Sequence, residues 1–357
     1  MRKRRPTWFL AALLFSGRAG ADPTNSPMVV DLHVDVPWQV HFRGRGLDLV
    51  RGQASIEALV RGHYGGIVFP IYLPDHVRKT GPNIEDAEGV LQTITRIVSG
   101  HSEFLPLGST HAEPGKISSW MSIEGAGAFA ADIPRIDEFV RRGVRLVGLV
   151  HSQNNALASS ATGTPASYGL SLLGRQLCER IYSDGALVDV SHLSDAGFHD
   201  LLSIASQHRA PIVATHSNAR RLADHPRNLT DEQIDSIAQS GGVIGLNFHT
   251  PFLVRGGPAT VADVVRHFDH IVSLAGIDHV AIGSDFDGGI RPAEGLADAS
   301  ALPALANALR AHGVSESDLT KVFALNALRV LGFRNPTTTP VGAARRVGKE
   351  KAEILTR

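Results

Sequence analysis

Short apolar runs rich in β-branched residues alternate with amphipathic segments along most of the chain, and this alternation limits the fold more than any other feature. The runs have the length of buried strands, and the segments between them have helical periodicity. The strand candidates are residues 29–34, 66–73, 117–123, 144–150, 187–190, 211–214, 243–248 and 280–283. The helical segments include residues 84–98, 136–142, 196–206, 230–239 and 261–274. Strands that alternate with helices pair in parallel, because each helix carries the chain back across the sheet.

Eight strand–helix units in roughly 300 residues predict an α/β fold with a (β/α)8 barrel, and an open doubly wound sheet is the alternative. One helix start is well marked, because Thr230 and Gln233 form a capping box and two glycines follow the last periodic residue. No internal repeat or linker divides the core. We therefore expect one domain over residues 22–334.

The two ends of the chain differ in composition from this core. Residues 1–21 combine a basic start, an apolar run and a small-residue ending, which predicts a Sec-type signal peptide and export to the periplasm or the medium. The twin-arginine route ranks second, and the apolar run is about half the length that spans a bilayer, so no stable membrane anchor is expected. Residues 335–357 are rich in Thr, Pro, Ala and basic residues, which predicts a polar tail that is mobile or loosely packed.

Charge and cysteine content exclude other classes of protein. Lys and Arg total 35, as do Asp and Glu, and no basic stripe carries interleaved aromatic residues, so no nucleic-acid partner is expected. Residues 1–21 hold five basic and no acidic residues, so the charge without them is 30 − 35 = −5. Cys178 is the only cysteine, which excludes an intramolecular disulfide, and its helical position predicts a buried small residue rather than a catalytic thiol.

Ionisable residues end several of the strand candidates. His33 and Asp35 end the first, and residues two apart in an extended chain face the same side, so both can reach one metal ion. Glu124, His192 and His216 end three others. In a parallel barrel these strand ends share the face where active sites lie. Any one of these residues alone is more often a helix cap or a side chain bonded to backbone, but five in equivalent places predict a metal site.

Three imidazoles and two carboxylates suit zinc and exceed what a closed four-ligand site needs, although cobalt or manganese would accept the same ligands. Glu124 has two carboxylate oxygens and can therefore bridge two ions. Two ions at about 3.5 to 4 Å would share a hydroxide and polarise a substrate carbonyl. The implied reaction is hydrolysis.

Three further residues complete the candidate site. Asp285, among glycines after the last strand candidate, is the natural acceptor for the proton of the attacking water and the later donor to a leaving amine. An Asx-type turn is the alternative, to which we assign Asp287. His151 ends the fourth strand candidate and can donate to a developing oxyanion. Arg227, on the loop after His216, can bind a substrate carboxylate with two hydrogen bonds.

The segments that carry these residues resemble the membrane dipeptidase (renal dipeptidase) family of zinc peptidases, in a bacterial-type exported form. The matching segments run in order between about residues 29 and 333: DLHVDVPW (31–38), IEG (123–125), LVH (149–151), GLSLLG (169–174), VDVSH (188–192), THS (215–217), PRN (226–228) and GSDFDG (283–288).

The resemblance implies a distorted (β/α)8 TIM-type barrel with two zinc ions, which hydrolyses dipeptides and tolerates a D-residue on the C-terminal side. By the family's pattern, His33 and Asp35 bind one zinc ion, His192 and His216 bind the other, and Glu124 is shared. The same pattern implies an acid/base role for one residue and substrate binding by two more; these are Asp285, His151 and Arg227.

Some features of the family are not expected here. Mammalian members have disulfides and a lipid anchor, whereas this chain has one cysteine and a polar, basic end. A small peptide is the expected partner, and a homodimer is left open. Two alternatives remain: a binuclear metal amidohydrolase acting on N-acyl amino acids or lactams, and a non-catalytic binding protein of the cell envelope.

Overall fold

Eight parallel strands close into a barrel in their order along the chain, in a computed structural model that describes residues 26–109, 113–164 and 168–332. The strands are β1 (Val29–Asp31), β2 (Tyr64–Tyr72), β3 (Ser118–Glu124), β4 (Val144–Gly148), β5 (Leu187–Asp189), β6 (Val213–Ala214), β7 (Val243–Leu246) and β8 (Val280–Ile282). Each overlaps one predicted strand. Because β1 pairs with β8, the barrel prediction is confirmed and the open sheet is excluded.

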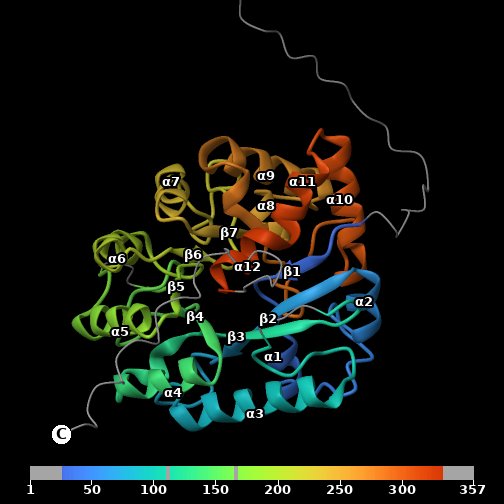
Figure 1. Ribbon diagram of the computed structural model, residues 1–357. Coiled ribbons are helices and arrows are strands. Elements are labelled where there is room, and N and C mark those ends of the chain that lie inside the picture. Colours follow the sequence, from blue (N-terminus) through green and yellow to red (C-terminus); the bar gives the residue numbers. More distant parts are fainter. Residues whose placement is uncertain (1–25, 110–112, 165–167, 333–357) are drawn as a thin grey trace, which may run out of the picture.

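Helices surround the strands (Figure 1). They are α1 (Val36–His41), α2 (Ile56–Arg61), α3 (Ile84–Gly100), α4 (Ile136–Arg141), α5 (Leu172–Ser183), α6 (Asp195–His208), α7 (Asp231–Gln239), α8 (Thr250–Leu253), α9 (Val261–Ala275), α10 (Leu302–Ala311), α11 (Glu316–Thr320) and α12 (Asn326–Val330). The five predicted helical segments all fall on helices. The predicted signal peptide and tail, 1–21 and 335–357, lie outside the described residues.

Local sequence explains where helices begin. The Thr230 hydroxyl accepts from Gln233 N at 3.2 Å, and the Gln233 side chain accepts from Thr230 N at 2.9 Å, so the predicted capping box is present. Ser171 and Ser194 cap α5 and α6 in the same way, each with a hydroxyl that accepts from a backbone N–H of the first turn. Such caps satisfy donors that would otherwise lack partners, and they fix the start of each helix.

Helix α12, the last helix of the described residues, covers the amino end of the barrel. Asn326 donates to Ile277 O and Val280 O at the start of β8, at 2.9 and 2.8 Å. Ala327 and Leu331 join an apolar cluster with residues of seven strands; these include Val30, Val68, Trp120, Leu146, Val213, Val243 and Ala281. The candidate site lies at the opposite end of the barrel, at the carboxyl ends of the strands.

Cys178 is fully buried in α5, as predicted. Burial raises the pKa of its thiol to about 12, so the thiolate that catalysis would need is not formed at neutral pH. Among the described residues, no helix combines the length and the apolar character needed to cross a bilayer.

Candidate active site

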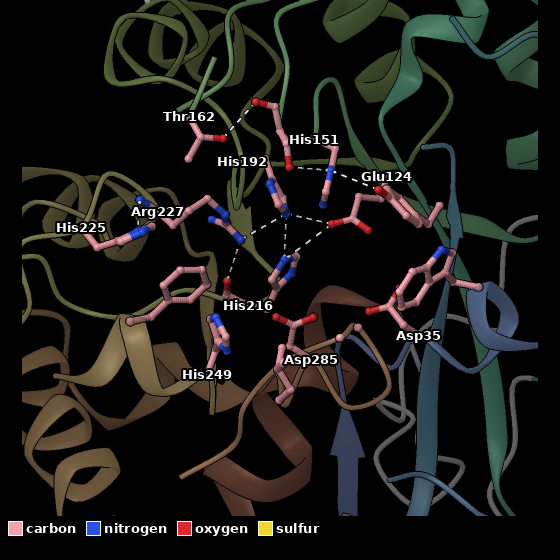
Figure 2. A pocket seen from close by; sticks show the side chains of 17 residues that line it. Asp35, Glu124, His151, Thr162, His192, His216, His225, Arg227, His249 and Asp285 are labelled. Atoms are coloured by element: carbon pink, nitrogen blue, oxygen red, sulfur yellow. Dashed lines mark hydrogen bonds and ion pairs between the residues drawn. The ribbon is translucent and has the colours of Figure 1, made fainter. Parts of the chain in front are cut away.

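The structure brings all eight predicted site residues together at the carboxyl ends of the strands. Figure 2 shows all of them except His33, which lies behind the pocket wall. A pocket of about 470 Å³ opens there. Seven of the eight residues line it: Asp35, Glu124, His151, His192, His216, Arg227 and Asp285. The eighth, His33, is 1% exposed and lies against the His216 ring, with 3.8 Å between ring centroids.

His33 and Asp35 lie just beyond β1, which ends earlier than the predicted strand. Asp35 is the residue before the first turn of α1, and Val34 still pairs with Phe286 after β8, so the segment remains anchored to the barrel. His33 Nε2 lies 3.2 Å from Asp35 Oδ2 and 3.6 Å from Glu124 Oε2. Both ring nitrogens of His33 are buried without a hydrogen-bond partner among the described residues.

Glu124 lies between the pair His33 and Asp35 and a second pair of residues, His192 and His216. Its other oxygen, Oε1, lies 2.9 Å from His192 Nε2 and 3.6 Å from His216 Nε2, and these two nitrogens are 3.1 Å apart. Burial lowers the pKa of both imidazoles well below the ordinary value, so each is neutral at pH 7 and can offer a lone pair.

These buried groups fit a metal site. A buried polar atom without a partner costs about 1 to 3 kcal/mol, and a cation among the imidazole nitrogens and carboxylate oxygens would remove that cost. Ligand atoms within 4.8 Å of one another form three groups: His33 with Glu124 and His216, Glu124 with His151 and His192, and His33 with Asp35 and Asp285. Glu124 belongs to two of the three.

Asp285 reaches the pocket from a loop in the left-handed region, with φ of 65°. Its backbone N donates to His33 O at 3.1 Å, and Asn247 Nδ2 donates to its Oδ2 at 2.9 Å. Burial raises the pKa of Asp285 to about 7, and the nearby Asp35 carboxylate adds to the rise. The carboxyl group is therefore suited to accept and return a proton near neutral pH.

Asp287 lies in the turn after Asp285, as predicted, but its carboxylate bonds to a distant segment. It accepts from Arg45 Nη1 at 2.6 Å, from Gln53 N at 2.8 Å and from Ala54 N at 3.1 Å. The assignment of its side chain to an Asx-type turn is therefore wrong. Asp287 fastens residues 45–54 to the loop that carries Asp285.

His151 is held from one side of its ring. Its Nδ1 lies 2.9 Å from Ser152 Oγ and 3.3 Å from the Tyr72 hydroxyl, and its ring centroid is 4.3 Å from that of His192. Burial raises the pKa of Tyr72, so its hydroxyl keeps its proton. These contacts involve only Nδ1, so Nε2 of His151 is available to a ligand in the pocket.

Arg227 is only 5% exposed, and no ion pair of the described residues includes it. Its Nη2 lies 3.2 Å from His192 Nε2, whereas Nη1 is buried without a hydrogen-bond partner in the described part of the chain. Burial lowers the pKa of Arg227 to about 10, so the guanidinium is charged at neutral pH. A buried cation with a free donor facing a pocket is suited to a carboxylate.

A model of the membrane dipeptidase family, peptidase family M19, matches residues 24–339. The chain belongs to this family.

Similar proteins of known name are also dipeptidases or metallopeptidases. Dipeptidase tcpJ of Claviceps purpurea is 30% identical over 82% of the chain and 72% of its own length. Two solved structures are similar with TM-scores of 0.76 over 86% of the chain. Dipeptidase AC, a metallopeptidase of family M19, is 30% identical over 98% of its length, and a metallopeptidase of Rhodobacter sphaeroides is 28% identical over 99%. The protein is thus a metallo-dipeptidase, as the sequence predicts.

Sequence reasoning missed part of the dipeptidase pocket. Tyr72, Trp38, His225, His249 and Phe252 also line it. Tyr72 ends β2, so its position at a strand end could have been noticed. His225 lies on the loop after β6, and His249 and Phe252 follow β7. Phe252 is in α8, a helix of four residues that is too short for periodicity to mark it, so the place of these three side chains depends on tertiary contacts.

Proposed function

We propose that this dipeptidase holds two zinc ions and hydrolyses dipeptides, including those with a C-terminal D-residue. The observation that carries the proposal is the position of Glu124. One of its oxygens lies 3.6 Å from His33 Nε2 and the other lies 2.9 Å from His192 Nε2. A carboxylate with its two oxygens toward separate ligand groups is arranged to bridge two ions.

In this proposal His33 and Asp35 hold one ion, His192 and His216 hold the other, and Glu124 is shared. Imidazole nitrogen and carboxylate oxygen are ligands that zinc prefers. Zinc bound there would polarise the peptide carbonyl and lower the pKa of an attacking water. The lowered pKa of His192 and His216 fits the assignment, because only an unprotonated nitrogen can be a ligand. The pKa of His33 is instead raised well above its ordinary value, because the Glu124 and Asp35 carboxylates outweigh its burial, so a metal ion would have to displace its proton.

Asp285 carries the proton in this proposal. Asn247 holds Oδ2, so Oδ1 is the oxygen left to take a proton from water and return it to the leaving amine. The pKa of about 7 places the group where both steps are accessible, although a bound cation beside Asp35 would lower that pKa.

Arg227 and His151 bind the substrate in this proposal. The guanidinium, whose Nη1 has no hydrogen-bond partner among the described residues, receives the C-terminal carboxylate, so we expect hydrolysis to require a free carboxylate. His151, held at Nδ1 by Ser152 and Tyr72, donates from its other nitrogen to the carbonyl oxygen of the scissile bond.

The tolerance of a C-terminal D-residue has support from a relative. The Rhodobacter sphaeroides metallopeptidase, which is similar over 86% of this chain, was solved with a phosphinate mimic of the dipeptide L-Ala-D-Ala.

The test combines metal analysis with a substrate panel. We expect two zinc ions per chain and release of alanine from L-Ala-L-Ala and L-Ala-D-Ala. Glu124→Gln should lose zinc, whereas Glu57→Gln, at an 81% exposed side chain on α2, should keep two equivalents. Faster hydrolysis of N-acetyl-L-alanine than of either dipeptide, or full zinc content in Glu124→Gln, would refute the proposal.

We also propose that residues 1–21 direct export and are removed, and that residues 22–334 form the catalytic domain. Mass spectrometry of the protein from the periplasm should give a chain that starts near residue 22. A full-length chain confined to the cytoplasm would contradict the prediction.

A further inference from the structure

The three histidines at the centre of the site are not held alike. His216 Nδ1 lies 2.8 Å from the hydroxyl of Thr215. By contrast, Nδ1 of His33 and Nδ1 of His192 are buried with no hydrogen-bond partner among the described residues. Of the three rings, His216 is therefore the one that a neighbouring side chain holds on the face away from Glu124.

The Thr215 hydroxyl is in turn held by Asp189, the last residue of β5. Thr215 Oγ1 donates to Asp189 Oδ2 at 2.6 Å, and Thr215 N donates to Oδ1 at 3.0 Å. Ser191 donates to the same Oδ1 from both its backbone and its hydroxyl, at 3.0 and 2.7 Å. Asp189 is 5% exposed and Thr215 is fully buried, so water does not compete for these bonds.

The chain of bonds determines where the ring proton of His216 lies. A hydroxyl has one hydrogen, and that of Thr215 points to the Asp189 carboxylate. The hydroxyl then presents a lone pair to His216, so Nδ1 must carry the proton. Nε2 keeps its lone pair and faces Glu124 Oε1 at 3.6 Å and His192 Nε2 at 3.1 Å.

We propose that Asp189 and Thr215 are positioning residues that fix His216 in the Nδ1–H tautomer and thereby prepare its Nε2 as a metal ligand. The part that concerns metal rests on the proposed function, whereas the tautomer is a property of the metal-free chain. Removing such a partner of a metal-binding histidine typically weakens metal affinity by about 10- to 100-fold. The effect should fall on the ion that His192 and His216 share, because Thr215 bonds to His216, whereas the side-chain hydrogen bonds of Asp189 and Thr215 in the described part of the chain do not reach His33 or Asp35.

The tautomer is measured first, on metal-free protein labelled with 15N-histidine, by long-range 1H–15N correlation; His216→Ala identifies the His216 signals. Wild type should show the Nδ1–H form. Thr215→Val keeps the side-chain shape without the hydroxyl and should give a mixture with the Nε2–H form, whereas Thr215→Ser should restore wild type. Asp31→Asn is the matched control, since it alters an equally buried carboxylate under the site that bonds to the backbone of His33 and Ser284.

Metal affinity is measured next, by titration against a zinc chelator. Thr215→Val and Asp189→Asn should bind the second zinc equivalent about 10- to 100-fold more weakly, with the first unchanged, and Thr215→Ser should match wild type. If Asp189→Asn does not fold, the Thr215→Val and Thr215→Ser pair still decides, because their metal-free thermal unfolding can be compared directly.

Two results would overturn the proposal: an Nε2–H tautomer for His216 in the wild type, or wild-type affinity for both equivalents in Thr215→Val. A wild type that binds fewer than two zinc ions would instead refute the proposed function, and the tautomer result would stand independently of it.

Discussion

Gly288 lies against two carboxylates of the site, and adding one methyl group there is a sharp perturbation. A Cβ at this position would be 2.3 Å from Asp285 Oδ1 and 2.7 Å from Asp35 Oδ2. The backbone of Gly288 is outside the left-handed region, so alanine is compatible with its conformation. The effect of Gly288→Ala should therefore come mainly from the displaced carboxylates, with a smaller part from the backbone oxygen of Asp285 at 3.0 Å.

The size of the effect follows from the distances. Ordinary contacts of a Cβ begin at 3.4 Å, so Asp285 Oδ1 must move by 3.4 − 2.3 = 1.1 Å and Asp35 Oδ2 by 3.4 − 2.7 = 0.7 Å. A misplacement of about 1 Å in a catalytic group can cost about 100-fold in rate, or about 2.7 kcal/mol. The movement of Asp285 would also strain its hydrogen bond from Asn247.

The assay is kcat and KM on L-Ala-D-Ala, with zinc content and thermal unfolding measured on the same samples. We expect kcat to fall about 100-fold in Gly288→Ala while the fold persists. Gly256→Ala is the matched control, because no atom lies within 4 Å of its Cβ position and its φ is also outside the left-handed region. Wild-type kcat and zinc content in Gly288→Ala would refute the reasoning.

Three further outcomes are expected. Arg227→Met should raise KM for dipeptides by about 10- to 100-fold, since a charged hydrogen bond is worth about 1.5 to 3 kcal/mol, and a dipeptide amide should show no such loss; equal losses for both would contradict carboxylate binding. Removal of metal with 1,10-phenanthroline should abolish activity and added zinc should restore it, whereas activity that survives complete removal would exclude metal-dependent hydrolysis. His267, fully buried between Ala219 N and Leu253 O, has its pKa lowered to about 4 by burial. In the unfolded chain this imidazole takes up a proton near pH 6.5, whereas in the folded chain it stays neutral down to about pH 4. The free energy of unfolding should therefore fall by about 3 kcal/mol as the pH drops from above 6.5 toward 4. Urea unfolding of His267→Gln should show a weaker pH dependence than wild type.

The fold could be predicted because its determinants are local. Each strand candidate is a short apolar run. The five predicted helical segments show helical periodicity, and one of them also begins with a cap at Thr230. Strand ends share one face of a parallel barrel, so Glu124 and His216 could be placed together although 92 residues separate them, as 216 − 124 gives.

The rest depends on contacts that the local sequence does not encode. Asp287 bonds to Arg45, 242 residues away, so its turn residues gave no sign of the partner. Phe252 and His225 meet with ring centroids 4.6 Å apart, on segments with no periodicity. The roles of the metal ligands remain predictions, as do the boundaries at residues 21 and 335.

The contact between β1 and β8 joins the two ends of the barrel sequence, so it constrains when during folding the site can form. Ser284 N donates to Asp31 Oδ1 across 253 residues of sequence, and Asp285 N donates to His33 O beside it. A contact of such long range forms late, because closing the intervening loop must first be compensated by other contacts. During synthesis, His33 therefore cannot contact Asp285 until most of the chain has been made. An incomplete chain lacks the finished site, so uptake of metal at the proposed site would report that the ring has closed.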